Sequence, residues 1–394
     1  MRQTTSSTGV ERVEARLRER VEANGRFFAA ESERLARLCH KMAERFAREG
    51  RLVAFGASPA DRSDARHVAV EFVHPVIVGK RALPALDLGS EFERRLPVLL
   101  RPEDMVMGFA FPKPDESVER AVRKARERGA MTFALTGEAG EYSFAPPDGD
   151  PFVIQEIFEV LYHVLWETVH VYFEHREQGH DVGNSSFLYP FLGKGQQPLE
   201  EVVREVQGSM LQKVQEVNLL RTAAAESEAA AISQIAAAIA ERLERGGKLI
   251  AFGNGGSATD ANDLVSDCMD PPPGWGVIPA VSLSAEPANV TAIANDIGTE
   301  AIFTRQLIAH ARPEDVAVGI STSGDSANIL AALAEARKRG LLTVGIVGYD
   351  GGRILGERLA DHAIVVRSDY IPRIQEVQAS IYHVLRGLLE RRKV

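Results

Sequence analysis

The chain has 394 residues, of which 45% are hydrophobic and 26% are charged, so it is long enough for two or three globular domains. Its formal net charge of −9 argues against nucleic acid or an anionic membrane surface as its main partner. The two cysteines are too few for a disulfide framework, and neither a signal peptide nor a membrane span is evident, so we expect a reducing, cytoplasmic setting.

The N-terminal half alternates predicted helices and strands. In chain order these are one long helix or two over 10–48, a strand at 52–56, a loop containing Pro59, a helix over 65–73, strands at 82–88, 105–111 and 131–136 with a helix over 116–128 between the last two, and an apolar helix from Pro151 to about Arg176. Such alternation is typical of a mainly parallel sheet with helices on both faces.

The C-terminal half repeats this plan. A Gly-, Pro-, Asn- and Gln-rich stretch at 179–198 predicts a linker between domains at 1–178 and 199–394. The later elements are a helical region over 199–245, strands at 249–252, near 277, at 315–320, and near 343 and 364, helices over 257–267 and 327–339, and a closing helix over 372–392.

Matching sequences in the two halves indicate an internal duplication. LVAFG at 52–56 corresponds to LIAFG at 249–253. IQEI and LYHVL, between 154 and 165, correspond to IQEV and IYHVL between 374 and 385. In both halves a Gln and a His stand at the same spacing, Gln155 with His163 and Gln375 with His383, which predicts two copies of one fold.

Two loops in the C-terminal half have the composition of anion-binding turns. Gly253-Asn254-Gly255-Gly256-Ser257 lies between a predicted strand and a helix start, where glycines let the backbone approach a ligand closely. The run from Ser321 to Ser326 also follows a strand and offers several hydroxyl donors. Open parallel sheets bind ligands at this edge, so the two loops predict a site for a phosphate group.

These loops, together with Ala294–Gly298, Ala327-Asn328 and Arg373–Glu376, resemble the sugar isomerase (SIS) domain family, and most of all its phosphoheptose isomerase type, which acts on sedoheptulose 7-phosphate. The resemblance implies two doubly wound, mainly parallel, five-stranded flavodoxin-like sheets. It also implies that the sugar phosphate is bound by Asn254, Gly255, Gly256, Ser257, Asn295, Asp296, Ser321, Thr322, Ser323 and Ser326.

The family's metal and catalytic positions are divided unequally between the halves. They are a His and a Glu four residues apart after the glycine loop, and a Gln and a His eight apart on the last helix. The metal positions fall on His67, Glu71, Gln155 and His163 in the first half and on Asp263, Asp267, Gln375 and His383 in the second. The resemblance makes Asp267, His383, Glu71 and His163 the candidate catalytic residues.

Moving a carbonyl between C1 and C2 of a sugar requires a base for the carbon-bound proton and an acid or Lewis acid at the enediolate oxygen. A carboxylate with a histidine suits the first task, and a divalent metal such as Zn²⁺ suits the second. No nucleotide cofactor is needed. In the first half the glycine turn has become Gly56-Ala57-Ser58-Pro59 and the serine loop Phe109–Pro114, so we expect that half not to bind phosphate in the usual way.

Several alternatives stay open at this stage. The histidines are surrounded by Leu, Tyr and Val and could be ordinary core residues, while Asp263 and Asp267 could be solvated carboxylates. The chain could be a non-catalytic sugar-phosphate sensor, or belong to the amino-sugar isomerase branch, which also carries tandem SIS domains. As an enzyme, it is expected to form a homodimer that makes a pseudo-tetramer, with phosphate loops of one half meeting catalytic residues of the other.

Overall fold

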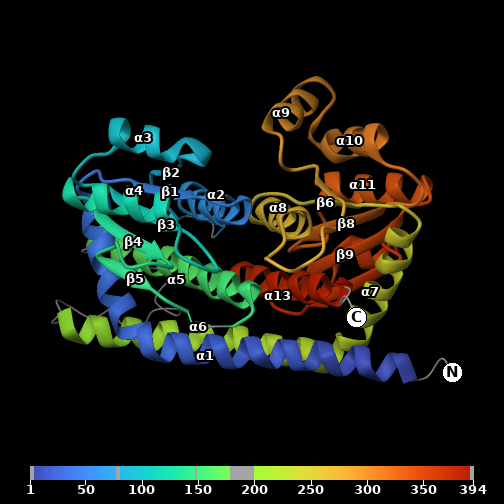
Figure 1. Ribbon diagram of the computed structural model, residues 1–394, viewed down its shortest axis with the longest axis horizontal. Helices are drawn as coiled ribbons and strands as arrows, with labels where there is room; N and C mark the ends of the chain where they lie inside the picture. Colours follow the sequence, from blue (N-terminus) through green and yellow to red (C-terminus); the bar gives the residue numbers. More distant parts are fainter. Residues whose placement is uncertain (1–3, 77–79, 147–148, 178–198, 391–394) are drawn as a thin grey trace. The chain divides into compact units, whose positions relative to one another are not determined.

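The computed structural model describes residues 4–76, 80–146, 149–177 and 199–390, which form two compact units (Figure 1). The N-terminal unit is Glu22–Glu216, and the C-terminal unit combines Met1–Val21 with Val217–Val394. The first part of α1 (Thr4–Ala47) therefore belongs with the last half of the chain. The domain boundaries expected at 178 and 199 stay a prediction. The expected linker at 179–198 lies outside the described residues.

The N-terminal unit contains a five-stranded sheet in the order β2-β1-β3-β4-β5, with all neighbouring strands parallel. Its strands are β1 (Leu52–Gly56), β2 (Ala85–Asp87), β3 (Met105–Phe109), β4 (Met131–Leu135) and β5 (Tyr142–Phe144). The three central strands are buried along their whole length, which explains their unbroken apolar sequences.

Helices cover both faces of this sheet. The helix α2 (Pro59–Val73) packs on β1 and against α5 (Pro151–Glu177) on one face. On the other face, α4 (Glu116–Glu127) and α3 (Phe92–Leu99), which follows the short helix η1 (Gly89–Glu91), share one apolar core with β1 and β3. Phe55 of β1 stacks on Phe92 of α3 with ring centroids 4.6 Å apart.

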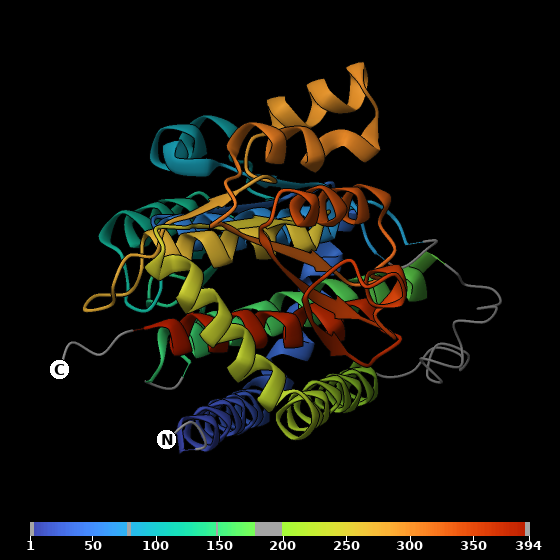
Figure 2. The ribbon, with the colours of Figure 1, turned by 90° about the vertical axis from the view of Figure 1, so that its right-hand side faces the viewer.

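The C-terminal unit repeats this architecture with the strand order β7-β6-β8-β9-β10, again entirely parallel. The strands are β6 (Leu249–Phe252), β7 (Ala280–Ser282), β8 (Val316–Ser321), β9 (Leu342–Gly348) and β10 (His362–Val366). On one face lie α7 (Ala229–Glu244), α8 (Gly256–Met269) and α13 (Ile371–Leu389). On the other face lie α10 (Ile302–His310) and α11 (Ala327–Lys338) (Figure 2). The helices α9 (Pro287–Asp296) and η4 (Thr299–Ala301) precede α10, and α12 (Gly352–Gly356) follows β9.

Two long helices contribute to both units. The helix α1 (Thr4–Ala47) is continuous, while the helical region expected over 199–245 consists of α6 (Leu199–Ser227) and α7, which meet at Glu228. Within the C-terminal unit the first part of α1 lies against the last helix: Arg12 donates to the Gly387 carbonyl at 3.5 Å, and the Arg16 guanidinium lies 2.8 Å from where a Gly387 Cβ would be. Residues near the start and near the end of the sequence therefore pack together in this unit.

The strand order confirms the prediction of two doubly wound sheets. In each sheet the chain order reverses between the two strands next to its centre, β1 and β3 in one and β6 and β8 in the other. Ligands of open α/β sheets bind at the carboxyl ends of such a strand pair. Among the described residues, no helix is long and apolar enough to cross a bilayer.

Some elements differ from expectation. The predicted loop containing Pro59 is the first turn of α2, because Ser58 caps the helix and proline is well suited to its first position. The strand expected at 105–111 ends at Phe109, and the one expected near 277 begins at Ala280. The strand β5 and the helices α3, α9, α10 and α12 were not predicted.

Candidate functional site

The glycine loop follows β6 and begins α8. Gly255, the N-cap of that helix, has a φ of 56°, which favours glycine. A Cβ on Gly253 would lie 2.2 Å from the Ser257 carbonyl oxygen, so this turn has no room for a side chain. The first turn of α8 is thereby held tightly against the end of β6, with its free N–H groups at the carboxyl edge of the sheet.

The serine loop follows β8 and is shaped by its own hydroxyls. The Ser321 hydroxyl accepts from the Gly324 N–H at 3.0 Å, and that of Ser323 accepts from the Asp325 N–H at 3.2 Å. Ser326 is the N-cap of α11, but its side chain makes no capping hydrogen bond. Thr322 is half-buried. Several oxygen and nitrogen donors therefore lie after β6 and β8, as the sequence predicted.

A third loop, after β9, supports the serine loop. The Asp325 carboxylate accepts from the Arg353 N–H at 2.8 Å, and the Gly324 carbonyl accepts from the Ile354 N–H at 3.1 Å. Gly324 has a φ of +70°, and a Cβ there would be only 2.3 Å from the Gly351 carbonyl oxygen. The position of the serine loop is therefore set by the loop beside it.

Two residues that sequence reasoning did not select connect these loops. Asn328 and Asn254 donate to each other through their side-chain amides at 2.9 Å in both directions, which joins the start of α11 to the glycine loop. Ser284 accepts from the Gly253 N–H at 3.2 Å and donates to the Gly253 carbonyl at 2.9 Å. The sequence contained a signal for Asn328, because this residue belongs to the serine-loop motif. It contained no such signal for Ser284.

Asn295 and Asp296 lie elsewhere. Both are exposed at the end of α9, where the Asn295 amide donates to the Asp296 carboxylate at 2.8 Å. Among the described residues, the structure does not bring this pair into hydrogen-bonding contact with the two loops. Their role in substrate binding stays a prediction.

A carboxylate–histidine pair lies in the core of the C-terminal unit. Asp267 of α8 and His383 of α13 are both buried, with Oδ2 3.2 Å from Nε2. Arg386 holds the two helices together by donating from Nε to the Asp267 carbonyl at 2.9 Å. Asp263 and Gln375 are buried on the same helices. The structure thus brings together two of the candidate catalytic residues, Asp267 and His383, in the core of this unit.

The N-terminal unit contains a more compact group of ligand atoms. His67 and Glu71 of α2 and His163 of α5 are fully buried, and one ligand atom of each lies within 4.8 Å of the other two. His67 Nε2 is 3.8 Å from Glu71 Oε1, and the two imidazole rings meet edge to face at 5.2 Å. Two histidines and a carboxylate are the donors of many divalent metal sites.

A hydrogen-bond chain favours one tautomer of His67. The Tyr162 hydroxyl lies 2.9 Å from His67 Nδ1 and donates to Asp64 Oδ1 at 3.3 Å, an arrangement that is consistent with the proton on Nδ1. The lone pair of Nε2 then faces Glu71 and His163. Burial, and next the neighbouring His163, lower the pKa of His67, which keeps the ring neutral. Tyr162 and Asp64 were not predicted, although Tyr precedes His in both repeats.

Gln155, the fourth predicted residue, is a buried amide on the same helix as His163. Neither its oxygen nor its nitrogen has a hydrogen-bond partner among the described residues, although the side chain is 2% exposed. A buried amide without partners is costly, and a cation would satisfy its oxygen. His170, on the same helix, contrasts with this, because both of its ring nitrogens lie within 2.9 Å of main-chain carbonyls. The donor set of His67, Glu71 and His163 therefore fits a divalent metal, and Gln155 stays a predicted ligand.

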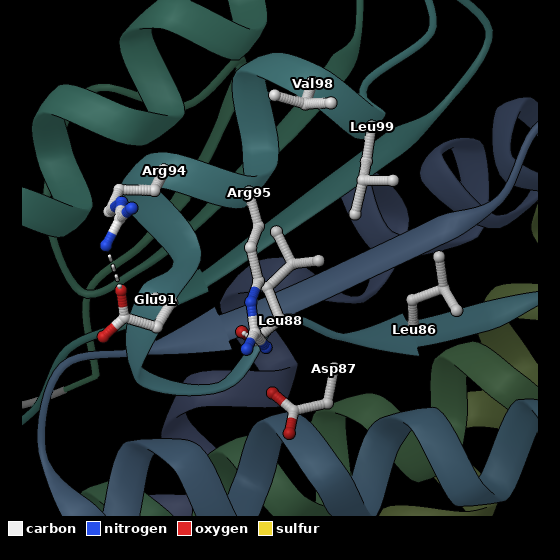
Figure 3. A pocket seen from close by; sticks show the side chains of 8 residues that line it. All are labelled: Leu86, Asp87, Leu88, Glu91, Arg94, Arg95, Val98 and Leu99. Carbon is white, nitrogen blue, oxygen red and sulfur yellow. Dashed lines mark hydrogen bonds and ion pairs between the residues drawn. The ribbon is translucent and has the colours of Figure 1, made fainter.

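A cavity of the N-terminal unit lies away from these residues. A hollow of about 720 Å³ lies between β2 and α3 and is lined by exposed apolar side chains and a few charged ones (Figure 3). Val98, at its rim, is 82% exposed. None of the predicted site residues lines it.

Comparisons with known proteins agree with this geometry. Residues 214–348 match the family model described as "SIS domain". Phosphoheptose isomerase from Nitratiruptor sp. is 44% identical over 151 residues, 38% of this chain and 80% of the relative. The enzyme of the same name from Solidesulfovibrio magneticus is 43% identical over 164 residues, 40% of this chain and 77% of the relative.

One solved structure extends the similarity in fold to both units. The crystal structure of tagatose-6-phosphate ketose/aldose isomerase from Escherichia coli aligns with 98% of this chain and 94% of its own, with a TM-score of 0.55 and 13% identity. At that identity the likeness concerns the fold alone. From the sequence matches, the chain belongs to the SIS domain family and is an isomerase related to the phosphoheptose isomerases.

Proposed function

We propose that this protein interconverts the ketose and aldose forms of a phosphorylated sugar, with sedoheptulose 7-phosphate as the ketose. The observation that carries the proposal is the pair of donor-rich loops after β6 and β8 in the same unit as the buried Asp267–His383 pair. The relatives named phosphoheptose isomerase support the choice of a heptose.

The phosphate group is bound at the two loops. The free N–H groups at the start of α8 and the hydroxyls of the serine loop supply donors to a doubly charged group. The Asn254–Asn328 pair fixes the two loops relative to each other before substrate arrives. Binding energy gained at the phosphate then positions the distant carbonyl end of the sugar.

The proton transfer needs a base and a proton carrier. In the proposed reaction, a carboxylate takes the proton from the carbon beside the carbonyl, and the released electron pair forms the carbon–carbon double bond of the enediolate. A histidine moves a proton between the two oxygens, and the carboxylate returns its proton to the neighbouring carbon. Asp267 with His383, and Glu71 with His163, are the candidate pairs, and both are buried.

His67, Glu71, His163 and Gln155 would hold a divalent metal, because their donors are buried and His67 presents a lone pair. When bound, such an ion supplies Lewis-acid stabilisation of negative charge on oxygen. The tautomer favoured by Tyr162 is what prepares His67 for this role.

The test is a direct assay of the purified chain on sedoheptulose 7-phosphate, followed by NMR, with and without added Zn²⁺. Conversion to an aldoheptose 7-phosphate, with weaker turnover of hexose and pentose phosphates, is the expected result. Binding without turnover under both conditions would contradict the proposal and support a sensor.

Matched variants separate the two candidate pairs. Asp267→Asn and Glu71→Gln remove one carboxylate each, and loss of the base should lower kcat by at least about a hundredfold. His163→Gln is compared with His170→Gln, since both histidines are buried on α5 and only the first belongs to the ligand cluster. Light scattering on the same samples tests the expected homodimer.

A further inference from the structure

In the N-terminal unit, one carboxylate bridges the two loops that correspond to the phosphate loops. Asp61, in the first turn of α2, accepts from the Ser58 N–H at 2.8 Å through Oδ2 and from the Phe111 N–H at 3.0 Å through Oδ1. Ser58 follows β1 and Phe111 follows β3. Asp61 is only 2% exposed, so an anionic group is enclosed at the carboxyl ends of the two central strands.

Asp61 takes the place that Ser257 has in the other unit. A Cβ on Gly56, at the end of β1, would lie 2.3 Å from the Asp61 Cβ and 2.6 Å from its carbonyl oxygen. A Cβ on Gly253, just after β6, would lie 2.2 Å from the Ser257 carbonyl oxygen and 2.9 Å from its Cβ. The two glycines are equivalent in the repeat, so the residues packed on them are equivalent too.

A second carboxylate follows the same pattern. The N-cap of α4 is Asp115, which accepts from the N–H groups of Ser117 at 2.8 Å and Val118 at 3.1 Å. The N-cap of the equivalent helix α11 is Ser326, which makes no such bond. Two positions that carry hydroxyls in the C-terminal unit thus carry acids here, and the acids use the backbone donors that an outside anion would need.

We infer that Asp61 is an internal ligand that fills the anion position of the N-terminal unit, so that this unit accepts no phosphate group. Together with the proposed function, on which this part of the inference rests, each chain then binds one sugar phosphate, at the loops of the C-terminal unit. The N-terminal unit keeps its buried histidine cluster and contributes no second phosphate site.

The inference is tested by hydrogen–deuterium exchange of the full chain, read on peptides covering 56–64 and 107–111, with inorganic phosphate as the probe. In the wild type, exchange of the Ser58 and Phe111 amides should not respond to phosphate. In Asp61→Ala these amides lose their acceptor, and we expect them to exchange about tenfold faster and to be protected again by phosphate.

Two further variants act as controls. Asp61→Asn keeps the shape of the side chain but only one of its two acceptor oxygens. The side chain still fills the position, so phosphate should not protect this variant. Ser257→Asp places a carboxylate at the equivalent position of the C-terminal unit and should make exchange over 253–260 insensitive to phosphate. This second variant leaves α2 unchanged and tests the idea even if Asp61→Ala does not fold.

Protection of the wild-type N-terminal peptides by phosphate would overturn the inference. So would an Asp61→Ala variant whose exchange is unchanged or does not respond to phosphate, or a Ser257→Asp variant that still responds. The readout involves no turnover, so a chain without isomerase activity would contradict the proposed function and leave this inference standing.

Discussion

Replacing Gly324 by alanine should displace the serine loop and weaken substrate binding. Gly324 has a φ of +70°, where an L residue costs about 1–2 kcal/mol. Its new Cβ would also lie 2.3 Å from the Gly351 carbonyl oxygen and 2.7 Å from the Gly351 carbonyl carbon, which are backbone atoms of the supporting loop. Forcing these loops apart should cost about a further 1–3 kcal/mol, the usual range for overpacking.

Gly340 offers a matched control for the backbone strain. Its φ is +84°, but the nearest atom to its absent Cβ is Pro313 Cβ at 3.8 Å, an ordinary contact. Gly340 has about the same φ as Gly324. Gly340→Ala should therefore lose only about 1–2 kcal/mol of stability, which is the cost of a left-handed backbone. The difference between the two variants isolates the clash between the serine loop and the loop after β9.

Urea unfolding measures the stabilities, and the KM for sedoheptulose 7-phosphate reports on the loop. We expect Gly324→Ala to be the less stable variant by about 1–3 kcal/mol, and to raise KM by about tenfold through misplacement of the serine hydroxyls. Gly340→Ala should leave KM unchanged. Equal losses of stability in the two variants, with an unchanged KM in both, would refute the reasoning.

Three other predictions concern single interactions. Tyr162→Phe removes the acceptor for His67 Nδ1 and should weaken Zn²⁺ binding by about 10- to 100-fold in a competition titration, whereas His170→Gln should not. Asn328→Ala breaks both amide bonds to Asn254 and should raise the substrate KM by about fivefold without changing kcat; an unchanged KM would mean that the pair is not needed. Burial raises the pKa of Asp61 from 3.8 to about 6, so between these values the folded state binds the proton more tightly and stability must fall as pH rises, by about 3 kcal/mol in total. Unfolding curves of the wild type and Asp61→Asn should therefore diverge across this window, and a constant difference would contradict the assignment.

The fold could be predicted well because its signals are local. The central strands are unbroken apolar runs, so β1 was placed at its observed bounds and β6 within the matched LIAFG segment. The three-residue strand β5 was missed because Tyr142–Phe144 is too short to show a pattern. Pro59 was assigned to a loop, although Ser58 with Asp61 three residues later forms a capping box that marks a helix start.

The site could be predicted only in part. The repeated Gln–His spacing indicated His163, and the structure brings this residue to His67 and Glu71. The Tyr162–Asp64 hydrogen bond joins two helices far apart in the sequence, so neither residue type nor spacing predicts it. The role of Asp61 depends on a main-chain N–H fifty positions later, and a backbone donor leaves no trace in the amino-acid sequence.

The C-terminal unit is built from two segments that are far apart in the sequence, and this has a consequence for biosynthesis. Because Met1–Val21 belong to this unit with Val217–Val394, the leading part of α1 is synthesised about two hundred residues before the segments against which it packs, such as Ser233 of α7 and Gly387 of α13. The unit in between, Glu22–Glu216, can form earlier as a continuous stretch of chain. A nascent polypeptide must therefore keep the leading part of α1 unassembled until the later segments of its unit have been made, and expressing the two halves separately would leave each without part of its own structure.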